Sequence, residues 1–222
     1  MQVVSNNTSS PSLAPPAGER DVRALMRGGK MGMALSDGDL LPGEHHVKTK
    51  FANMVISVKE SGLSRFAFDK YMGLVGMKGK EAIGGKAHLT NYRIIFKSHF
   101  FNRVRGKHSI FLPNVTEVSA TFNNLIVETA AQRFEFVMWF KQGFIDAVNH
   151  EKESISPAQL EKLKKAVVSY PAAIGIGLQK WATLEIINQV CLGAQKASSV
   201  LENLSGTEKN AFLEILELFQ PT

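Results

Sequence analysis

The stretch GGKAHLTNYRIIFKS, residues 84–98, decides the fold, because its apolar side chains recur at every second position. The apolar positions are Ala87, Leu89, Ile94 and Phe96. Mostly polar residues stand between them, Lys86 and His88 among them. A period of two residues is typical of β-strands that bury one face. We therefore expect strands in both halves of this stretch.

The same alternation extends outward in both directions, from Leu41 to about Val137, with turn residues at regular intervals. This spacing predicts at least six short strands in an antiparallel sheet with one buried face. The period then changes, because Phe140, Phe144 and Val148 fall on one stripe of a helix. We expect a sheet that is closed by one helix.

The chain after the sheet contains sequence patterns that are typical of helix starts. Ser156 to Gln159 forms a capping-box pattern with Pro157 at the first helical position, and Ser205 to Glu208 forms a second such pattern. We expect helices near 157–169, 172–203 and 207–219, with breaks at Pro171 and at Gly175 or Gly177. The apolar stripe of this tail can dock on the sheet, pair with a second chain or lie in a membrane interface.

The chain divides into three parts. Residues 1–40 are rich in small and polar residues and predict a disordered or weakly structured arm without a signal peptide. Residues 41–150 form the sheet domain, and residues 151–222 form the helical region. Charged and polar residues interrupt the most apolar region, Tyr170 to Leu192, so we expect no transmembrane segment.

Composition limits the class of protein. The 222 residues are 44% hydrophobic and 21% charged, which is typical of a globular chain. The one cysteine, Cys191, cannot form an internal disulfide, and this favours a reducing compartment. We expect a cytoplasmic protein, with any membrane association peripheral.

The positive charge is concentrated in the middle of the sequence. The chain has a net charge of +6, and residues 41–150 alone carry +7. Between Lys78 and Lys107, eight basic residues face a single acidic one, Glu81. A local excess of this size indicates an anionic partner, although a solvated surface that keeps the protein soluble is the alternative.

Three segments carry a recognisable pattern: Gly43-Glu44, residues 84–98 with their Leu-Thr-Asn-x-Arg core, and residues 109–115 (SIFLPNV). Together they resemble the GRAM domain family, which has the pleckstrin-homology fold. The resemblance covers about residues 41–149. It implies an α+β fold: a bent antiparallel sheet or partly closed barrel of about seven strands, capped by one C-terminal helix. It also implies binding to phosphoinositides, other anionic lipids or proteins, and no catalysis.

These observations give one set of candidate site residues. We expect a basic rim that binds phosphorylated head groups, formed by Lys86, Arg93, Lys97, Arg103, Arg105 and Lys107. Phe100 and Phe101 lie within this basic stretch and are expected to insert into the membrane interface, with packing in the core as the alternative. Arg93 has a structural alternative as well, because it is close to a hairpin turn.

The sequence offers no site for catalysis, a cofactor or a metal. Glycine-rich segments lack the residues of nucleotide-binding loops, and the histidines lack metal-ligand spacing. We therefore expect a non-enzymatic lipid-binding module. The alternative is a protein-interaction adaptor that uses the sheet edge or the C-terminal helices, which also offer a route to a homo-oligomer. Binding of nucleic acid ranks last.

Overall fold

A computed structural model describes residues 33–57, 79–99, 102, 106–175, 178, 183–188, 197–204 and 206–220. Within these residues, seven strands form one antiparallel sheet in the order β4-β3-β2-β1-β7-β6-β5. The strands are β1 (His46–Ser57), β2 (Lys80–Thr90), β3 (Arg93–Ser98), β4 (Lys107–Phe111), β5 (Val115–Ala120), β6 (Asn124–Thr129) and β7 (Arg133–Val137). The α+β class and the strands expected from the alternation are confirmed.

The expected partly closed barrel is not formed. Strands β4 and β5 are the two edges of the described sheet and do not pair with each other. Helix α7 (Gly206–Phe219) packs against β4 and against the short 3₁₀ helix η2 (Leu112–Asn114). Its Glu214 carboxylate accepts hydrogen bonds from the Phe111 amide in β4 and from the Thr129 hydroxyl in β6. Helix α7 thus contacts the sheet at the edge strand β4 and at the end of β6.

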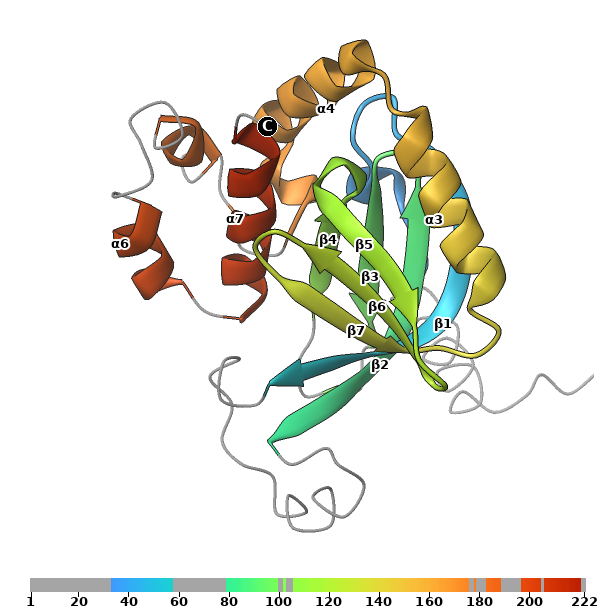
Figure 1. Ribbon diagram of the computed structural model, residues 1–222. Helices are drawn as coiled ribbons and strands as arrows, with labels where there is room; N and C mark the ends of the chain where they lie inside the picture. The colour runs from blue at the N-terminus through green and yellow to red at the C-terminus, as the bar shows by residue number, and fades with distance from the viewer. Residues whose placement is uncertain are drawn as a thin grey trace, which may run out of the picture.

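One hydrophobic core lies between the sheet and helix α3 (Gln142–Ser154), which runs beside β1 in Figure 1. Alternate side chains of β2 and β3, including Leu89, Ile94 and Phe96, enter this core. Phe144, Ile145 and Val148 of α3 complete it. The apolar stripe predicted from the sequence therefore packs in this core. One correction applies: Phe140 precedes the helix and is exposed.

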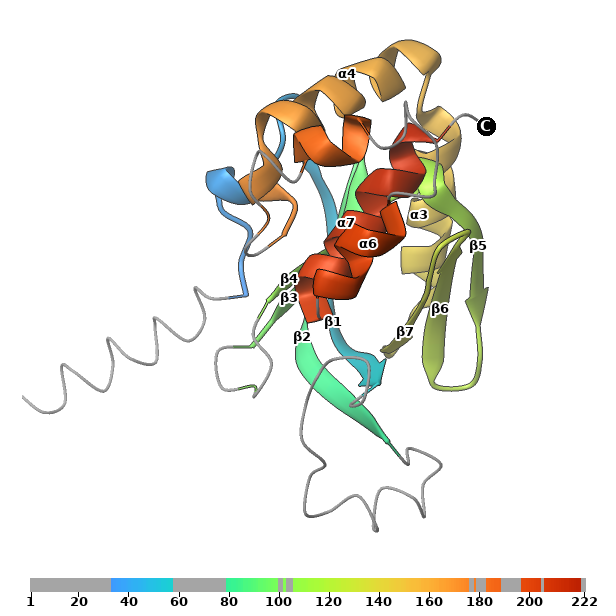
Figure 2. The same cartoon turned by 90° about the vertical axis from the view of Figure 1, so that its left-hand side faces the viewer.

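A second core joins the helical tail to the sheet domain. It contains Leu41, Tyr92 and Phe111 together with buried residues of α4 (Pro157–Ser169), the 3₁₀ helix η3 (Pro171–Ala173) and α7. In Figure 2, α7 and α4 lie against the sheet domain. Among the three expected uses of the apolar tail, docking on the sheet is the one observed.

The tail matches its predicted boundaries in part. Helix α4 begins after Ser156, whose hydroxyl accepts from the Gln159 amide at 3.3 Å, so the first capping box is confirmed. In the described part of the region 172–203, η3, residues 183–188 and α6 (Ala197–Asn203) are helical, and the expected break is present at Gly175, which is not helical. Ser205 of the second capping box lies outside the described residues. None of the helices in the described ranges is long and apolar enough to span a bilayer.

The end of the N-terminal arm contacts the sheet. Residues 1–32 lie outside the described residues, but Asp37–Asp39 form the 3₁₀ helix η1. The Met33 carbonyl lies 2.8 Å from His88 Nε2, and the Ala34 carbonyl accepts a hydrogen bond from Lys97 Nζ at 2.7 Å. Residues 33–40 are therefore structurally part of the sheet domain's surface.

Candidate functional site

Three of the predicted basic residues form a row across the sheet. Lys86 of β2 is directly opposite Lys97 of β3, which is directly opposite Lys107 of β4. Residues directly opposite each other point to the same face of a sheet, so the three lysines lie side by side on the face that turns away from the α3 core. We call these residues the lysine row.

An aromatic residue extends the row onto β1. Phe51 is directly opposite Lys86, and the Lys86 Nζ atom lies 4.9 Å from the centre of the Phe51 ring. This distance is typical of a cation–π contact. Phe51 is nevertheless 73% exposed. The β1 end of the row is thus open to solvent.

Asp39 partly neutralises the other end. Its carboxylate accepts hydrogen bonds from Lys97 Nζ at 2.7 Å and from Lys107 Nζ at 3.1 Å. Burial alone would raise the pKa of Asp39, but the hydrogen bonds from Lys97, Ser36 and Lys107 lower it overall. Burial lowers the pKa of Lys107, and the contact with Asp39 opposes this shift. Three cations and one anion leave the row with a positive charge.

Arg93 does not lie on an exposed rim, which corrects the prediction. The side chain is fully buried, and its Nε and Nη2 atoms both donate to the Glu44 carboxylate at 2.9 Å. The remaining donors are used by the Ser109 hydroxyl and by the carbonyls of Asp39 and Ala173. The helical tail and η1 cover this part of the sheet, so Arg93 has the structural role that was its alternative.

The residues that carry the family resemblance surround this arginine. Glu44 also accepts from the Thr90 hydroxyl at 2.7 Å and from the Leu41 amide. Asn91 donates to the Gly43 carbonyl and accepts from the His45 amide at 2.8 Å. Gly43 has φ +77°, a left-handed conformation that favours glycine. These motif positions therefore stabilise the β2–β3 hairpin and its junction with the chain before β1.

The remaining predicted site residues lie outside the described residues. They are Phe100, Phe101, Arg103 and Arg105. All four belong to the connection between Ser98, the end of β3, and Lys107, the start of β4. This connection begins and ends next to the lysine row. Asp39 was not among the predicted site residues, because its partners are 58 and 68 positions away in the sequence.

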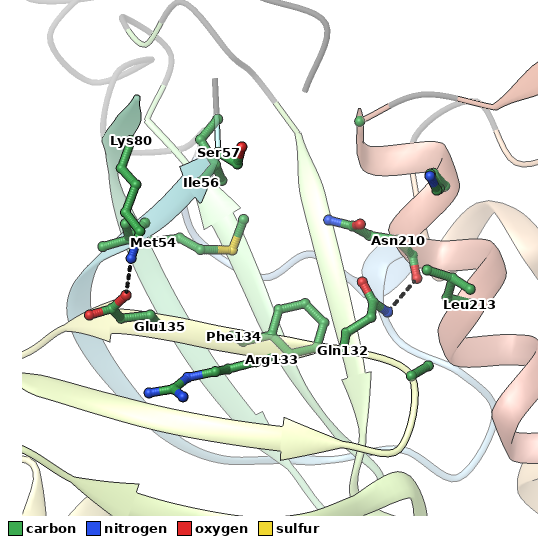
Figure 3. A pocket seen from close by; sticks show the side chains of 14 residues that line it. Met54, Ile56, Ser57, Lys80, Gln132, Arg133, Phe134, Glu135, Asn210 and Leu213 are labelled. Atoms are coloured by element: carbon green, nitrogen blue, oxygen red, sulfur yellow. Dashed lines mark hydrogen bonds and ion pairs between the residues drawn. The ribbon is translucent and has the colours of Figure 1, made fainter. Parts of the chain in front are cut away.

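A groove of about 780 Å³ lies elsewhere, between β1, β7 and α7 (Figure 3). Gln132 donates to the Asn210 carbonyl on one side of it, and Lys80 pairs with Glu135 at 3.2 Å on the other. None of the described members of the predicted site lines this groove. In the described part of the chain, no three His, Cys, Asp or Glu side chains are close enough to hold a metal ion.

Comparisons with known proteins identify no family for the chain. No protein-family model matches it, and no curated protein is significantly similar to it. One similar solved structure is the C-terminal domain of an unknown protein from Leishmania infantum, with 11% identity and a TM-score of 0.35. The match covers 60% of this chain and 99% of that chain. A likeness at this level supports no conclusion about function.

Proposed function

We propose that this protein is a non-enzymatic module of the GRAM and pleckstrin-homology type that binds anionic lipid head groups, phosphoinositides among them. The alignment of Lys86, Lys97 and Lys107 across three adjacent strands is the observation that carries the proposal. Phosphate groups bind clustered Lys and Arg donors, and each basic residue near an anionic leaflet contributes about 1 kcal/mol.

The head group would bind at the open end of the row. Lys86 is half-buried and has no carboxylate among its described contacts, in contrast to Lys97 and Lys107. The β3–β4 connection supplies Arg103 and Arg105, and its Asn102 side chain donates to the Gly84 carbonyl, two residues before Lys86 in β2. We therefore place the binding surface at Lys86 and this connection. Arg93 is not part of it.

Sedimentation with vesicles tests the proposal. The full chain is mixed with vesicles of phosphatidylcholine alone, or with added phosphatidylserine or a single phosphoinositide, at low and at physiological salt. We expect binding to the anionic vesicles, and we expect Lys86→Ala and Arg103→Ala/Arg105→Ala each to weaken it by about fivefold or more. Lys162→Ala, at an exposed lysine of α4, is the matched control and leaves binding unchanged.

The alternative is a protein-interaction adaptor. Strand β5 is one edge of the described sheet, and an edge strand can pair with a peptide from another protein. The apolar side of the tail is less available to a partner protein, because Phe212, Ile215 and Leu218 are buried within the chain. A protein that fails to bind any of the vesicles at low salt contradicts the lipid proposal and leaves the β5 edge as the surface to investigate.

A further inference from the structure

Three large aromatic side chains are exposed on two turns. Among the described residues, Phe122, Phe140 and Trp139 have the highest exposed fractions of the large hydrophobic side chains, at 95%, 87% and 79%. Phe122 lies in the turn between β5 and β6, and the other two lie between β7 and α3. We call Phe122, Trp139 and Phe140 the aromatic turns.

Backbone and side-chain contacts hold the two turns together. The Met138 amide donates to the Asn123 carbonyl at 3.2 Å, and Lys141 Nζ donates to the Phe122 carbonyl at 2.9 Å. Figure 1 shows the β5–β6 turn beside the start of the connection to α3. The two turns that carry the aromatic residues therefore lie side by side, although 17 positions separate Phe122 from Trp139 in the sequence.

The backbone at Phe140 is strained. Its φ is +50°, and it is the one residue other than glycine with a positive φ in the described part of the chain. This conformation is unfavourable for a bulky side chain, and here the ring gains no burial in exchange. A glycine or asparagine would suit the turn better. Strain of this kind, with an exposed aromatic ring, indicates a role in binding.

The strand register places these turns next to the lysine row. Val137 of β7 is directly opposite Asn53 of β1 and Asn124 of β6. Trp139 follows Val137 by two positions, and Phe51 precedes Asn53 by two, so the β7–α3 connection begins close to the Phe51 part of β1. Phe51 is itself opposite Lys86. The aromatic turns are thus close to the Phe51 end of the lysine row.

Two lysines lie close to the turns that carry the aromatic residues. Lys141 follows Phe140 directly, and Lys48 Nζ donates to the Gly143 carbonyl at the start of α3 at 2.7 Å. Each ammonium group has further donors for lipid phosphates. The nearest described carboxylate on α3, Asp146, already accepts a hydrogen bond from Gln142. Protruding aromatic rings flanked by lysines match a bilayer interface, in which rings enter the acyl boundary and cations contact anionic head groups.

We infer that the aromatic turns insert into the interface of an anionic membrane and orient the open, Lys86 end of the lysine row toward its head groups. This inference rests on the proposed function and adds an insertion surface that is separate from the β3–β4 connection. It also changes the expected insertion residues, since Phe100 and Phe101 are not required for it.

Fluorescence of Trp139 tests insertion directly. The Trp181→Phe variant leaves Trp139 as the sole tryptophan, and the Trp139→Phe variant is its counterpart. On vesicles of phosphatidylcholine and phosphatidylserine, we expect Trp139 emission to shift to the blue and to be quenched by lipids brominated in the acyl chain. The Trp139→Phe variant should show neither change. If the Trp181→Phe variant does not fold, the difference between wild type and Trp139→Phe gives the same signal.

Sedimentation separates this inference from the proposed function. We expect Phe122→Ala/Phe140→Ala to bind anionic vesicles about tenfold or more weakly. Tyr170→Ala, at an exposed aromatic residue distant in sequence from both turns, should bind as the wild type does. Sedimentation with unchanged Trp139 emission overturns the insertion and leaves the lysine-row proposal standing. Absence of sedimentation overturns both. A blue shift that depends on protein concentration without lipid would instead identify the surface as a contact between copies of the chain and would overturn the inference.

Discussion

Both ends of the lysine row carry basic residues, but these residues are buried and ion-paired at one end and open to solvent at the other. At the β3–β4 end, Lys107 and the neighbouring Arg93 are buried and hydrogen-bonded to Asp39 and Glu44. At the β1–β2 end, Lys86 contacts the exposed ring of Phe51. The difference arises because η1 and the helical tail cover one end and not the other. Positive charge in a sequence therefore marks a binding surface only where no other part of the chain covers it.

The largest effect is expected at the covered end. Arg93→Met leaves the Glu44 carboxylate buried without its cation, and removing one partner of a buried ion pair costs about 3–5 kcal/mol. Urea unfolding followed by circular dichroism measures this loss. The matched control is Lys86→Met at the open end, which should change the free energy of unfolding by less than about 0.5 kcal/mol. Equal stability of the two variants would refute the distinction between the ends.

A second prediction concerns the pH dependence of the free energy of unfolding, which involves Glu214 of α7. Burial, and then the charge of Glu217, raise the pKa of Glu214 from 4.5 to about 8, while hydrogen bonds from Asn114, Phe111 and Thr129 oppose the shift. Between these two pH values the folded protein holds a proton that the unfolded chain has released. The free energy of unfolding should therefore fall as the pH rises toward 8.

The buried histidines affect stability at a lower pH than Glu214 does. Burial lowers the pKa of His88 and of His108 from 6.5 to about 4, so their protonation destabilises the fold only below pH 6.5. Thermal unfolding between pH 6.5 and 8 should thus show a decrease in the midpoint for the wild type. In Glu214→Gln this decrease should be smaller. A slope that persists in the variant would assign the pH dependence to another group.

The third prediction concerns the removal of the negative charge at the covered end of the row. Asp39→Asn keeps the shape of the side chain and removes the carboxylate that binds Lys97 and Lys107. One additional net positive charge near an anionic leaflet is worth about 1 kcal/mol, so vesicle affinity should rise about fivefold. Vesicle sedimentation measures the change, and Glu161→Gln, which adds the same charge at an exposed position of α4, is the control. Unchanged affinity would show that lipids do not reach this end of the row.

The smallest effect is expected at the aromatic turns. Phe140→Gly removes the strain of the left-handed backbone conformation and should raise the free energy of unfolding. The gain should be less than about 1 kcal/mol, because glycine also has more freedom in the unfolded chain. Phe140→Ala keeps the Cβ atom and should give no such gain. Both variants should bind vesicles more weakly, which separates stability from binding. A loss of stability in Phe140→Gly would mean that the ring packs in the fold.

Local patterns predicted the secondary structure well, because they depend on neighbours in the sequence. Alternation of apolar residues marked the strands, and the pattern of Ser156, Pro157 and Gln159 marked the start of α4. Phe140 misled the same reasoning: it has helical spacing with Phe144 but lies in a turn before α3. Periodicity reports which face a residue would occupy and cannot report where a helix begins.

The site was predicted only in part for a different reason. The sequence indicated a basic cluster, and Lys86, Lys97 and Lys107 do lie together. The partners of that cluster, Asp39 and Glu44, come from the chain before β1 and could not be found from spacing. Whether the chain belongs to the GRAM family stays a prediction, although the residues that carry the resemblance contact one another around Arg93.

By itself, the sequence determined the strands, the α4 helix and the excess of positive charge in the middle of the chain. These properties follow from side-chain periodicity, capping and composition, which act within a few residues. Only the tertiary structure decided which cations are free, because that depends on long-range contacts that bury Arg93 and pair Asp39 with two lysines. It also decided that the two turns that carry the exposed side chains of Phe122, Trp139 and Phe140 lie together, since strand pairing and a hydrogen bond from Lys141 join these distant segments.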